Sequence, residues 1–267
     1  MKIKIFFFTI LFILNTISFA KYAPYNYNTI NIGIFKSKNN PNAFGNPTKD
    51  VLLELEGSNR YKLLDLYWLM DRNDILESPK SDSHGDSSTL FTKINPRISL
   101  DGLLDKDLSI GPINEWFISY LYRGTNGNNG RLGIHNIGLG VSIDYFNFNY
   151  FKVNLMKKYN NRNYFTHEKQ WDGATLSFAY ETLIKQFNED IKLTFGGWGD
   201  LDFGLNKEER GENGKSYAYS WSNNLKLSYK NVSLVYTYQI NDNFTGRNQY
   251  SSDKNNQSFG ITYSFMF

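Results

Sequence analysis

The chain has 267 residues, and 29 Lys and Arg against 26 Asp and Glu leave a formal net charge of +3, which gives no reason to expect nucleic-acid binding. Cysteine is absent from the sequence, which excludes disulfides, thiolate catalysis and a lipid anchor on cysteine. Aromatic residues make up 17% of the chain, and the mean hydropathy of −0.49 is too polar for a helical membrane protein. Both values are normal for a transmembrane β-barrel, in which half of each strand faces water.

The N-terminal segment reads as a secretory signal peptide, expected to span residues 1–20. Lys2 and Lys4 form its basic start, residues 5–13 are almost continuously apolar, and small residues precede a cleavage point after Ala20. The alternative is a transmembrane helix, but the apolar run is shorter than the ~20 residues that a span requires. Without a Gly/Ser-rich or Pro-rich linker, residues 21–267 are expected to form one domain.

Alternating apolar and polar residues predict about twelve strands, which indicates an all-β fold, a transmembrane antiparallel barrel. The predicted strands are Tyr27–Phe35, Val51–Gly57, Tyr61–Met70, Leu90–Leu100, Ile113–Tyr122, Ile134–Tyr145, Phe148–Tyr159, Trp171–Leu183, Ile191–Gly199, Tyr217–Tyr229, Val232–Ile240 and Gln257–Phe267. An even number of strands returns both termini to the same side of the membrane, expected to be the periplasm.

The connections between these strands alternate in length. Long polar connections are predicted at Ser37–Asp50, Asp71–Ser88, Arg123–Arg131, Asn160–Gln170, Leu201–Ser216 and Asn241–Asn256, and short ones at Gly57–Arg60, Phe146–Asn147 and Lys230–Asn231. Short periplasmic turns and long extracellular loops are typical of outer-membrane barrels. The exception is Asp101–Pro112, a long connection where a short one is expected.

The last predicted strand carries the clearest membrane signal. Its aromatic and aliphatic residues share one parity and its small polar residues share the other, up to the terminal Phe267. Successive side chains of a strand point to opposite faces, so one face suits lipid and the other the lumen. The alternative is a C-terminal strand of a soluble sandwich. Together with the export signal, the pattern favours the outer membrane of a diderm bacterium.

Several segments in the middle of the chain resemble the Tsx-like nucleoside-specific channel proteins of the bacterial outer membrane. The blocks that carry the resemblance are Ser88–Asp101, with a Pro-Arg-x-Ser motif, Asp107–Trp116, with Gly-Pro-x-x-Glu-Trp, Gly138–Asp144, Trp171–Gly173, Phe44–Gly45, Leu53–Glu56 and Leu64–Tyr67. The resemblance implies a monomeric, twelve-stranded barrel that passes nucleosides by diffusion through a narrow lumen. It weakens from Gly204 onward, which leaves the ligand less defined than the fold.

The expected partners are therefore nucleosides, outer-membrane lipid and the barrel assembly machinery, with no cofactor. A channel of the same architecture for another small polar solute is the first alternative. A second alternative is a barrel whose loops act as an adhesin or a phage receptor.

Strand parity predicts which side chains face the lumen. The residues expected to line the pore or to bind substrate are Phe44, Glu54, Glu56, Asp65, Tyr67, Arg97 and Glu115. Further residues expected to point inward are Lys93, Asn95, Ser99, Asp144, Lys152, Asn154 and Lys226. Arg97 is expected to face Glu54, Glu56 or Glu115. Carboxylates can accept hydrogen bonds from ribose, and aromatic rings can stack on a base. The alternative is that these charges only fill the interior with salt bridges.

Three aromatic residues have two possible roles. The resemblance implies that Phe44, in the first long loop, helps to line the mouth of the pore, but it could equally pack on its own loop. Trp198 and Phe203 lie near the outer end of the ninth strand, where each could belong to the aromatic girdle or to the pore lining.

The sequence does not indicate an enzyme. His84, His135 and His167 have no metal-ligand spacing, and no nucleophile elbow is visible around Ser87 or Ser88. The segment Asp82–Asp86 could be read as a cation site, although a solvated loop is the simpler interpretation.

Overall fold

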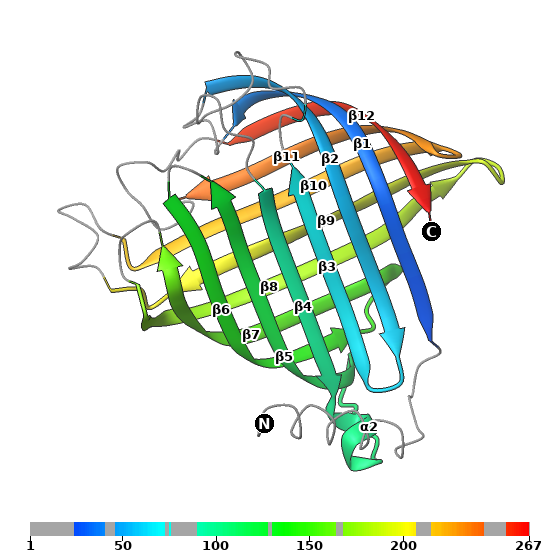
Figure 1. The fold of residues 1–267 in the computed structure, drawn as a ribbon. Helices are drawn as coiled ribbons and strands as arrows, with labels where there is room; N and C mark the ends of the chain where they lie inside the picture. Colours follow the sequence, from blue (N-terminus) through cyan, green and yellow to red (C-terminus); the bar gives the residue numbers. More distant parts are fainter. Residues whose placement is uncertain are drawn as a thin grey trace, which may run out of the picture.

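The protein is a closed antiparallel β-barrel (Figure 1). The computed structural model describes residues 24–40, 46–72, 75, 90–127, 130–163, 168–206, 215–242 and 255–266. Within these residues, each of twelve strands pairs with its neighbours in sequence, and the last strand pairs with the first. The predicted fold and strand number are therefore confirmed.

The strand bounds extend most of the predicted segments. They are β1 Tyr25–Asn40, β2 Asn46–Tyr61, β3 Leu64–Arg72, β4 Leu90–Ser99, β5 Ile113–Gly127, β6 Gly130–Ile143, β7 Phe148–Asn163, β8 Gln170–Gln186, β9 Ile191–Phe203, β10 Tyr217–Tyr229, β11 Val232–Asp242 and β12 Asn256–Met266. The short helix α2, Leu100–Leu104, lies between β4 and β5. The signal segment, Phe44 and Phe267 lie outside the described residues.

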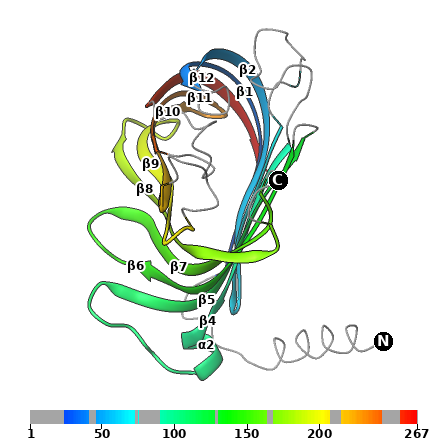
Figure 2. The same ribbon diagram turned by 90° about the vertical axis from the view of Figure 1, so that its left-hand side faces the viewer.

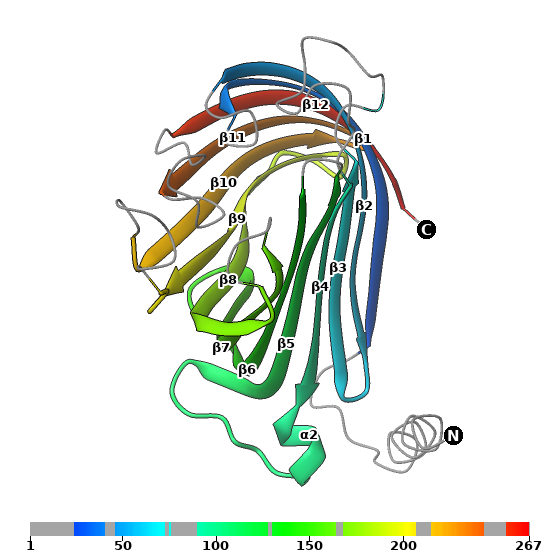
Figure 3. The same cartoon turned by 60° about the vertical axis from the view of Figure 1, so that its left-hand side comes forward.

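The seam between the two ends of the sheet is fully paired. β1 and β12 run antiparallel from Thr29 opposite Met266 to Ser37 opposite Ser258. Figures 2 and 3 show the wall curving round until these two strands lie side by side. Because a closed sheet has no free edge, every strand finds backbone hydrogen-bond partners on both sides, as a membrane-spanning sheet requires.

The two faces of the wall differ in polarity, as the alternation predicts. On β12 and β11 the outward side chains of Phe259 and Leu234 are 64% and 54% exposed. Inward side chains such as Thr29, Asn136 and Thr175 are at most 1% exposed and polar. An apolar outer wall around a polar interior is the arrangement of a transmembrane barrel. Within the described residues, no helix is both long enough and apolar enough to cross a membrane.

The barrel has a short-turn end and a long-link end. At the short-turn end, tight turns such as Lys62–Leu63 and Lys230–Asn231 join successive strands. At the opposite, long-link end lie the longer connections that begin after β1, β3, β7, β9 and β11, together with the β5–β6 hairpin. The predicted alternation of connection length is thus confirmed, except at the β5–β6 hairpin, where only residues 128–129 separate the two strands.

The long connection at the short-turn end is an ordered structure that contains α2, below the ends of β4 and β5 in Figure 3. Ser99 caps the helix by accepting a hydrogen bond from the backbone N–H of Gly102 at 3.1 Å. The carboxylate of Asp101 accepts the backbone N–H groups of Leu108 and Trp116 at 3.1 and 3.0 Å. These bonds hold the connection against the start of β5.

Three predicted connections are wrong. The predicted loop Ser37–Asp50 is mostly strand, since β1 runs to Asn40 and β2 starts at Asn46. The predicted turn Gly57–Arg60 lies inside β2, which continues to Tyr61, so the strand predicted to start at Tyr61 begins instead at Leu64. The predicted loop Arg123–Arg131 is mostly strand, since β5 runs to Gly127 and β6 starts at Gly130. In these three segments, polar residues that resemble a loop in sequence occupy paired strand positions, where the ladder of backbone hydrogen bonds decides the structure.

Candidate functional site

The lumen near the short-turn end is crossed by a network centred on Asp65. Its carboxylate pairs with Arg97 of β4 at 2.6 Å and with Lys152 of β7 at 3.1 Å, and accepts the hydroxyl of Tyr25 of β1 at 3.2 Å. β3 and β7 are four positions apart in the strand order, so the Asp65–Lys152 pair spans the lumen instead of following the wall. We call these four residues the lower network.

A second buried ion pair lies beside the lower network. Arg60 of β2 donates to Glu115 of β5 at 2.5 Å, and the hydroxyl of Ser99 donates to the same carboxylate oxygen at 2.5 Å. The guanidinium groups of Arg60 and Arg97 both lie over the ring of Phe117, at 5.4 and 4.0 Å from its centroid. Buried carboxylates paired in this way form a stiff wall.

Towards the long-link end, β9 supplies the acidic groups of an upper network. Asp200 pairs with Lys93 and Arg123, each at 3.2 Å. Asp202 pairs with Arg123 at 3.1 Å and with Lys158 at 2.7 Å. Since the cations come from β4, β5 and β7, the upper network also reaches across the interior.

Trp198 lies in the lumen next to the upper network. It shares the inward parity of Asp200 on β9, and the ammonium group of Lys93 lies 4.8 Å from the centroid of its ring. Phe203 has the opposite parity and is 39% exposed on the outer wall. The structure therefore resolves the two roles left open by the sequence: Trp198 lines the pore and Phe203 belongs to the outer face.

The wall formed by β2 and β3 carries carboxylates of a different kind. Glu54 accepts a hydrogen bond from the amide of Asn31 at 2.6 Å, and Tyr67 hydrogen-bonds Glu56. Asp71 hydrogen-bonds Glu54 from the facing position on β3. Among the described residues, none of these three carboxylates forms an ion pair, in contrast to Asp65, Glu115, Asp200 and Asp202. We call Glu54, Glu56, Tyr67 and Asp71 the acidic wall.

Six of the seven predicted site residues therefore face the interior, and Phe44 lies outside the described residues. Two details of the prediction are wrong. The carboxylate partner of Arg97 is Asp65, whereas Glu115 pairs with Arg60. Asp144 does not point into the lumen, because β6 ends at Ile143 and Asp144 is an exposed residue of the following turn.

The sequence reasoning missed most of the upper network. Asp200 and Asp202 occupy alternate positions on β9, and the same parity rule that placed Glu54 and Glu56 inside would have placed them inside too. Boundaries that ended the fifth and ninth predicted strands too early hid Arg123, Asp200 and Asp202, whereas Lys158 lies inside the predicted seventh strand with the parity of Lys152 and Asn154.

The described residues give no support for a metal centre. Among them, no group of three or more His, Asp or Glu side chains could hold a metal ion. His135 faces outward on β6, where Nδ1 lies 2.7 Å from the hydroxyl of Tyr120. His84, His167 and the segment Asp82–Asp86 lie outside the described residues.

The family model for the nucleoside-specific channel-forming protein, Tsx, matches residues 27–266. The chain belongs to this family. The resemblance inferred from the sequence blocks is thereby confirmed, and the match includes the region after Gly204 where those blocks weaken.

Individual relatives match parts of the chain. The chain is 30% identical over 156 residues to outer membrane protein OmpK of Vibrio parahaemolyticus, covering 58% of this chain and 56% of that protein. It is 29% identical over 195 residues to the nucleoside-specific channel-forming protein Tsx of Shigella flexneri, covering 71% of this chain and 66% of that protein. The chain thus spans between about half and two thirds of the length of these relatives. Among solved structures, the NanC porin is 10% identical with a TM-score of 0.45, covering 88% of this chain and 98% of that one.

Proposed function

We propose that the protein is a passive channel of the bacterial outer membrane that admits nucleosides selectively. The observation that carries the proposal is the acidic wall, where Glu54 and Glu56 face the lumen without an ion-pair partner among the described residues. Family membership supports the same substrate class, since relatives of the chain are named nucleoside-specific channels. The proposed role is transport without a chemical step.

The acidic wall suits the sugar of a nucleoside. A ribose offers several hydroxyl donors and no charge, so it can bind carboxylates whose lone pairs are not already committed to a cation. Glu54 and Glu56 meet this condition, whereas Asp65 and Glu115 are occupied by arginines at 2.6 and 2.5 Å. We propose that Glu54 and Glu56 bind the sugar, and that the lower network with Arg97 and Glu115 maintains the shape of the pore.

Aromatic side chains of the lumen suit the base. Tyr67 lies beside Glu56 in the acidic wall, and Trp198 lies next to the upper network. Stacking contributes about 1–3 kcal/mol per base and tolerates different bases, which allows binding weak enough for release. The proposal also assigns Phe44 to the mouth of the pore.

We further propose the placement of the barrel in the membrane. The short-turn end faces the periplasm together with both termini, and the long-link end faces outward, in keeping with the usual asymmetry of these barrels. Residues 1–20 act as the export signal, and the barrel assembly machinery inserts residues 21–267 as a monomer.

Single-channel recording tests the substrate class. Neutral nucleosides should block the ion current partially and saturably, and free ribose should block it weakly. Glu54→Gln should weaken the block by ribonucleosides more than the block by 2′-deoxynucleosides, because it removes a carboxylate acceptor for the sugar. Asp190→Asn is the matched control, because Asp190 is an exposed carboxylate of the β8–β9 turn paired with Lys230. If nucleosides and sugars of equal size altered the current alike, the barrel would be a general porin.

A further inference from the structure

The outer wall contains a polar hollow near the long-link end. It has a volume of about 360 Å³, and its lining includes Thr92, Tyr122, Gly124, Gly133, Asn161 and Arg162. Gly124 and Gly133 face each other across β5 and β6, so the bulky side chains expected on an outer wall are missing at its floor. A Cβ atom built on Gly133 would lie 3.6 Å from the Cβ of Arg162, which places that arginine on the same side of the sheet.

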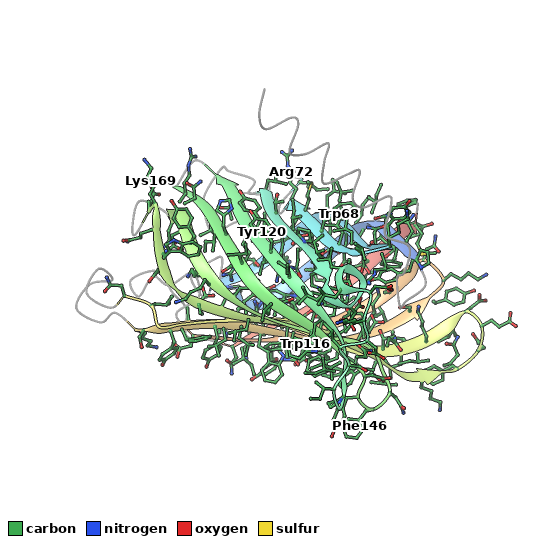
Figure 4. All side chains as sticks on the ribbon, turned by 90° about the horizontal axis from the view of Figure 1, so that it is seen from below. Trp68, Arg72, Trp116, Tyr120, Phe146 and Lys169 are labelled. Carbon is green, nitrogen blue, oxygen red and sulfur yellow. The ribbon has the colours of Figure 1, made fainter. Side chains whose placement is uncertain are left out.

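A second, aromatic hollow of about 250 Å³ adjoins the first. It is lined by Tyr120, His135, Asn136, Ile137, Tyr159 and Trp171. Tyr122 of the first hollow and His135 of the second have ring centroids 5.2 Å apart, so the two hollows are neighbours on the wall. Tyr120 lies in this part of the wall in Figure 4. We call the two hollows together the outer groove.

The outer groove combines positive charge with apolar surface. Arg162 is exposed at its polar part, and Lys157 is exposed on the outward face of β7, two residues from Tyr159. On the side towards the short-turn end, Leu139 and Leu155 are exposed and apolar. A cation on the outer wall of a barrel costs about 2–4 kcal/mol at the middle of the bilayer and about 0–1 kcal/mol near its surface. Arg162 is the second-last residue of β7, at the long-link end, and therefore suits the level of lipid headgroups, where an anion can pair with it.

We propose that the outer groove binds a membrane lipid whose headgroup is a phosphorylated sugar. Arg162 binds the phosphate, because a guanidinium group can donate two parallel hydrogen bonds to it. Tyr159, Trp171 and the rings around His135 contact the sugar, as aromatic side chains do at membrane surfaces. The acyl chains continue along Leu139 and Leu155. This site lies outside the pore, and it requires only that the long-link end faces the outer leaflet.

Native mass spectrometry of the mature, detergent-purified barrel tests the proposal. The probes are a phosphorylated disaccharide lipid, the same lipid without phosphate, and phosphatidylglycerol. We expect one molecule of the phosphorylated disaccharide lipid to be retained per barrel, in preference to the other two. Equal retention of phosphatidylglycerol would show a general affinity for anionic lipid and overturn the proposal.

Two variants separate charge from shape. Arg162→Gln should weaken retention about tenfold through the lost charge-assisted hydrogen bonds. Gly133→Leu should also reduce retention, although it changes no charge, because its side chain fills the polar hollow. The nearest heavy atom to a Cβ at Gly133 is 3.6 Å away, so the backbone accepts the substitution. A heat-modifiable band on a gel confirms that each variant folds, and nucleoside block of the channel should be unchanged in both.

Lys36→Gln is the matched control. Lys36 is an exposed, outward-facing lysine near the long-link end of β1, on a different part of the wall. Retention should stay at the wild-type level in this variant. A loss equal to that of Arg162→Gln, or full retention in Gly133→Leu, would show that diffuse charge holds the lipid and not the groove. A mass of two or more chains that persists without lipid and is lost in Gly133→Leu would assign the groove to a second copy of the chain, which also overturns the proposal.

Discussion

Carboxylates in the lumen behave differently according to the groups beside them. Asp65 is 3% exposed and contacts two cations, so its charge is balanced and its oxygens are occupied. Glu54 contacts the neutral amide of Asn31 and hydrogen-bonds Asp71. A buried carboxylate with two cationic partners stabilises the wall geometry, whereas one with neutral partners can exchange them for a passing ligand.

Arg97 should be important for stability and not for selectivity between nucleosides. Its guanidinium group donates to Asp65 at 2.6 Å, to Ser142 at 3.0 Å and to the carbonyl of Val141 at 3.2 Å. Arg97→Ala leaves Lys152 as the one cation that contacts Asp65, and removing one partner of a buried pair costs about 3–5 kcal/mol. Urea unfolding in micelles should show this loss.

The control for this measurement is Lys230→Ala. Lys230 pairs with Asp190 at 3.7 Å on the surface, so its removal should cost at most about 1 kcal/mol. An equal effect of the two substitutions would mean that the lower network does not support the barrel.

Trp198 should contribute to substrate binding through its ring. Trp198→Ala should weaken nucleoside block about tenfold, since stacking on a base contributes about 1–3 kcal/mol. Trp198→Phe should keep most of the block, because a smaller aromatic face remains. Trp221→Ala is the control: this tryptophan is 40% exposed on the outer wall of β10. Titration of single-channel current with nucleoside measures each affinity, and a similar loss in both alanine variants would contradict the pore-lining role.

Among the strands, the β1–β12 seam depends on a close contact between an aromatic ring and two glycines. A Cβ atom on Gly260 would lie 2.3 Å from the ring of Phe35, and one on Gly33 would lie 2.5 Å from the same ring. Gly260→Val should therefore push Phe35 aside and cost about 1–3 kcal/mol.

The double variant Phe35→Ala with Gly260→Val tests this cause directly. It should recover part of the loss, because the ring that collides with the new side chain is removed. The temperature at which the folded band disappears on a gel measures the effect. A double variant less stable than the sum of the single losses would contradict the proposed contact.

The sequence predicts strands and their faces well because both depend on local alternation. The faces of β11 and β12, and the inward positions of Glu54, Lys152 and Lys226, follow from parity alone. Strand ends were harder to place, because polar lumen residues resemble loop residues, as in the segment from Arg123 to Gly127.

Contacts across the lumen could not be predicted in the same way. The pairing of Asp65 with Lys152 joins residues 87 positions apart in sequence, on strands that are not neighbours. Such a contact depends on the tilt and stagger of the closed barrel, which no single strand contains.

For the whole molecule, the distribution of lumen charge sets ion preference as well as substrate preference. The lower network places two cations on one carboxylate, the upper network places three cations on two carboxylates, and the acidic wall has no ion-pair partner among the described residues. The interior therefore combines two layers, in each of which cations outnumber carboxylates by one, with a wall of carboxylates where Asp71 and Glu54 share a proton in their hydrogen bond. Permeating ions near that wall experience its charge over about 10 Å at 0.1 M salt.

Lys152→Gln should make the channel more selective for cations. The side chain of Lys152 is 18% exposed in the lumen, so its positive charge repels cations that pass it. Arg97 still pairs with Asp65 in the variant, so the barrel should fold. The reversal potential in a KCl gradient should shift towards the potassium equilibrium potential, and more strongly at low salt, where screening is weaker. Lys185→Gln, an exposed lysine beside Phe187 at the short-turn end of β8, should leave the reversal potential unchanged. If both substitutions shifted the reversal potential equally, charge outside the lumen would control selectivity. If neither substitution shifted the reversal potential, Lys152 would lie off the ion path. The lower network could then not be the layer that permeating ions cross.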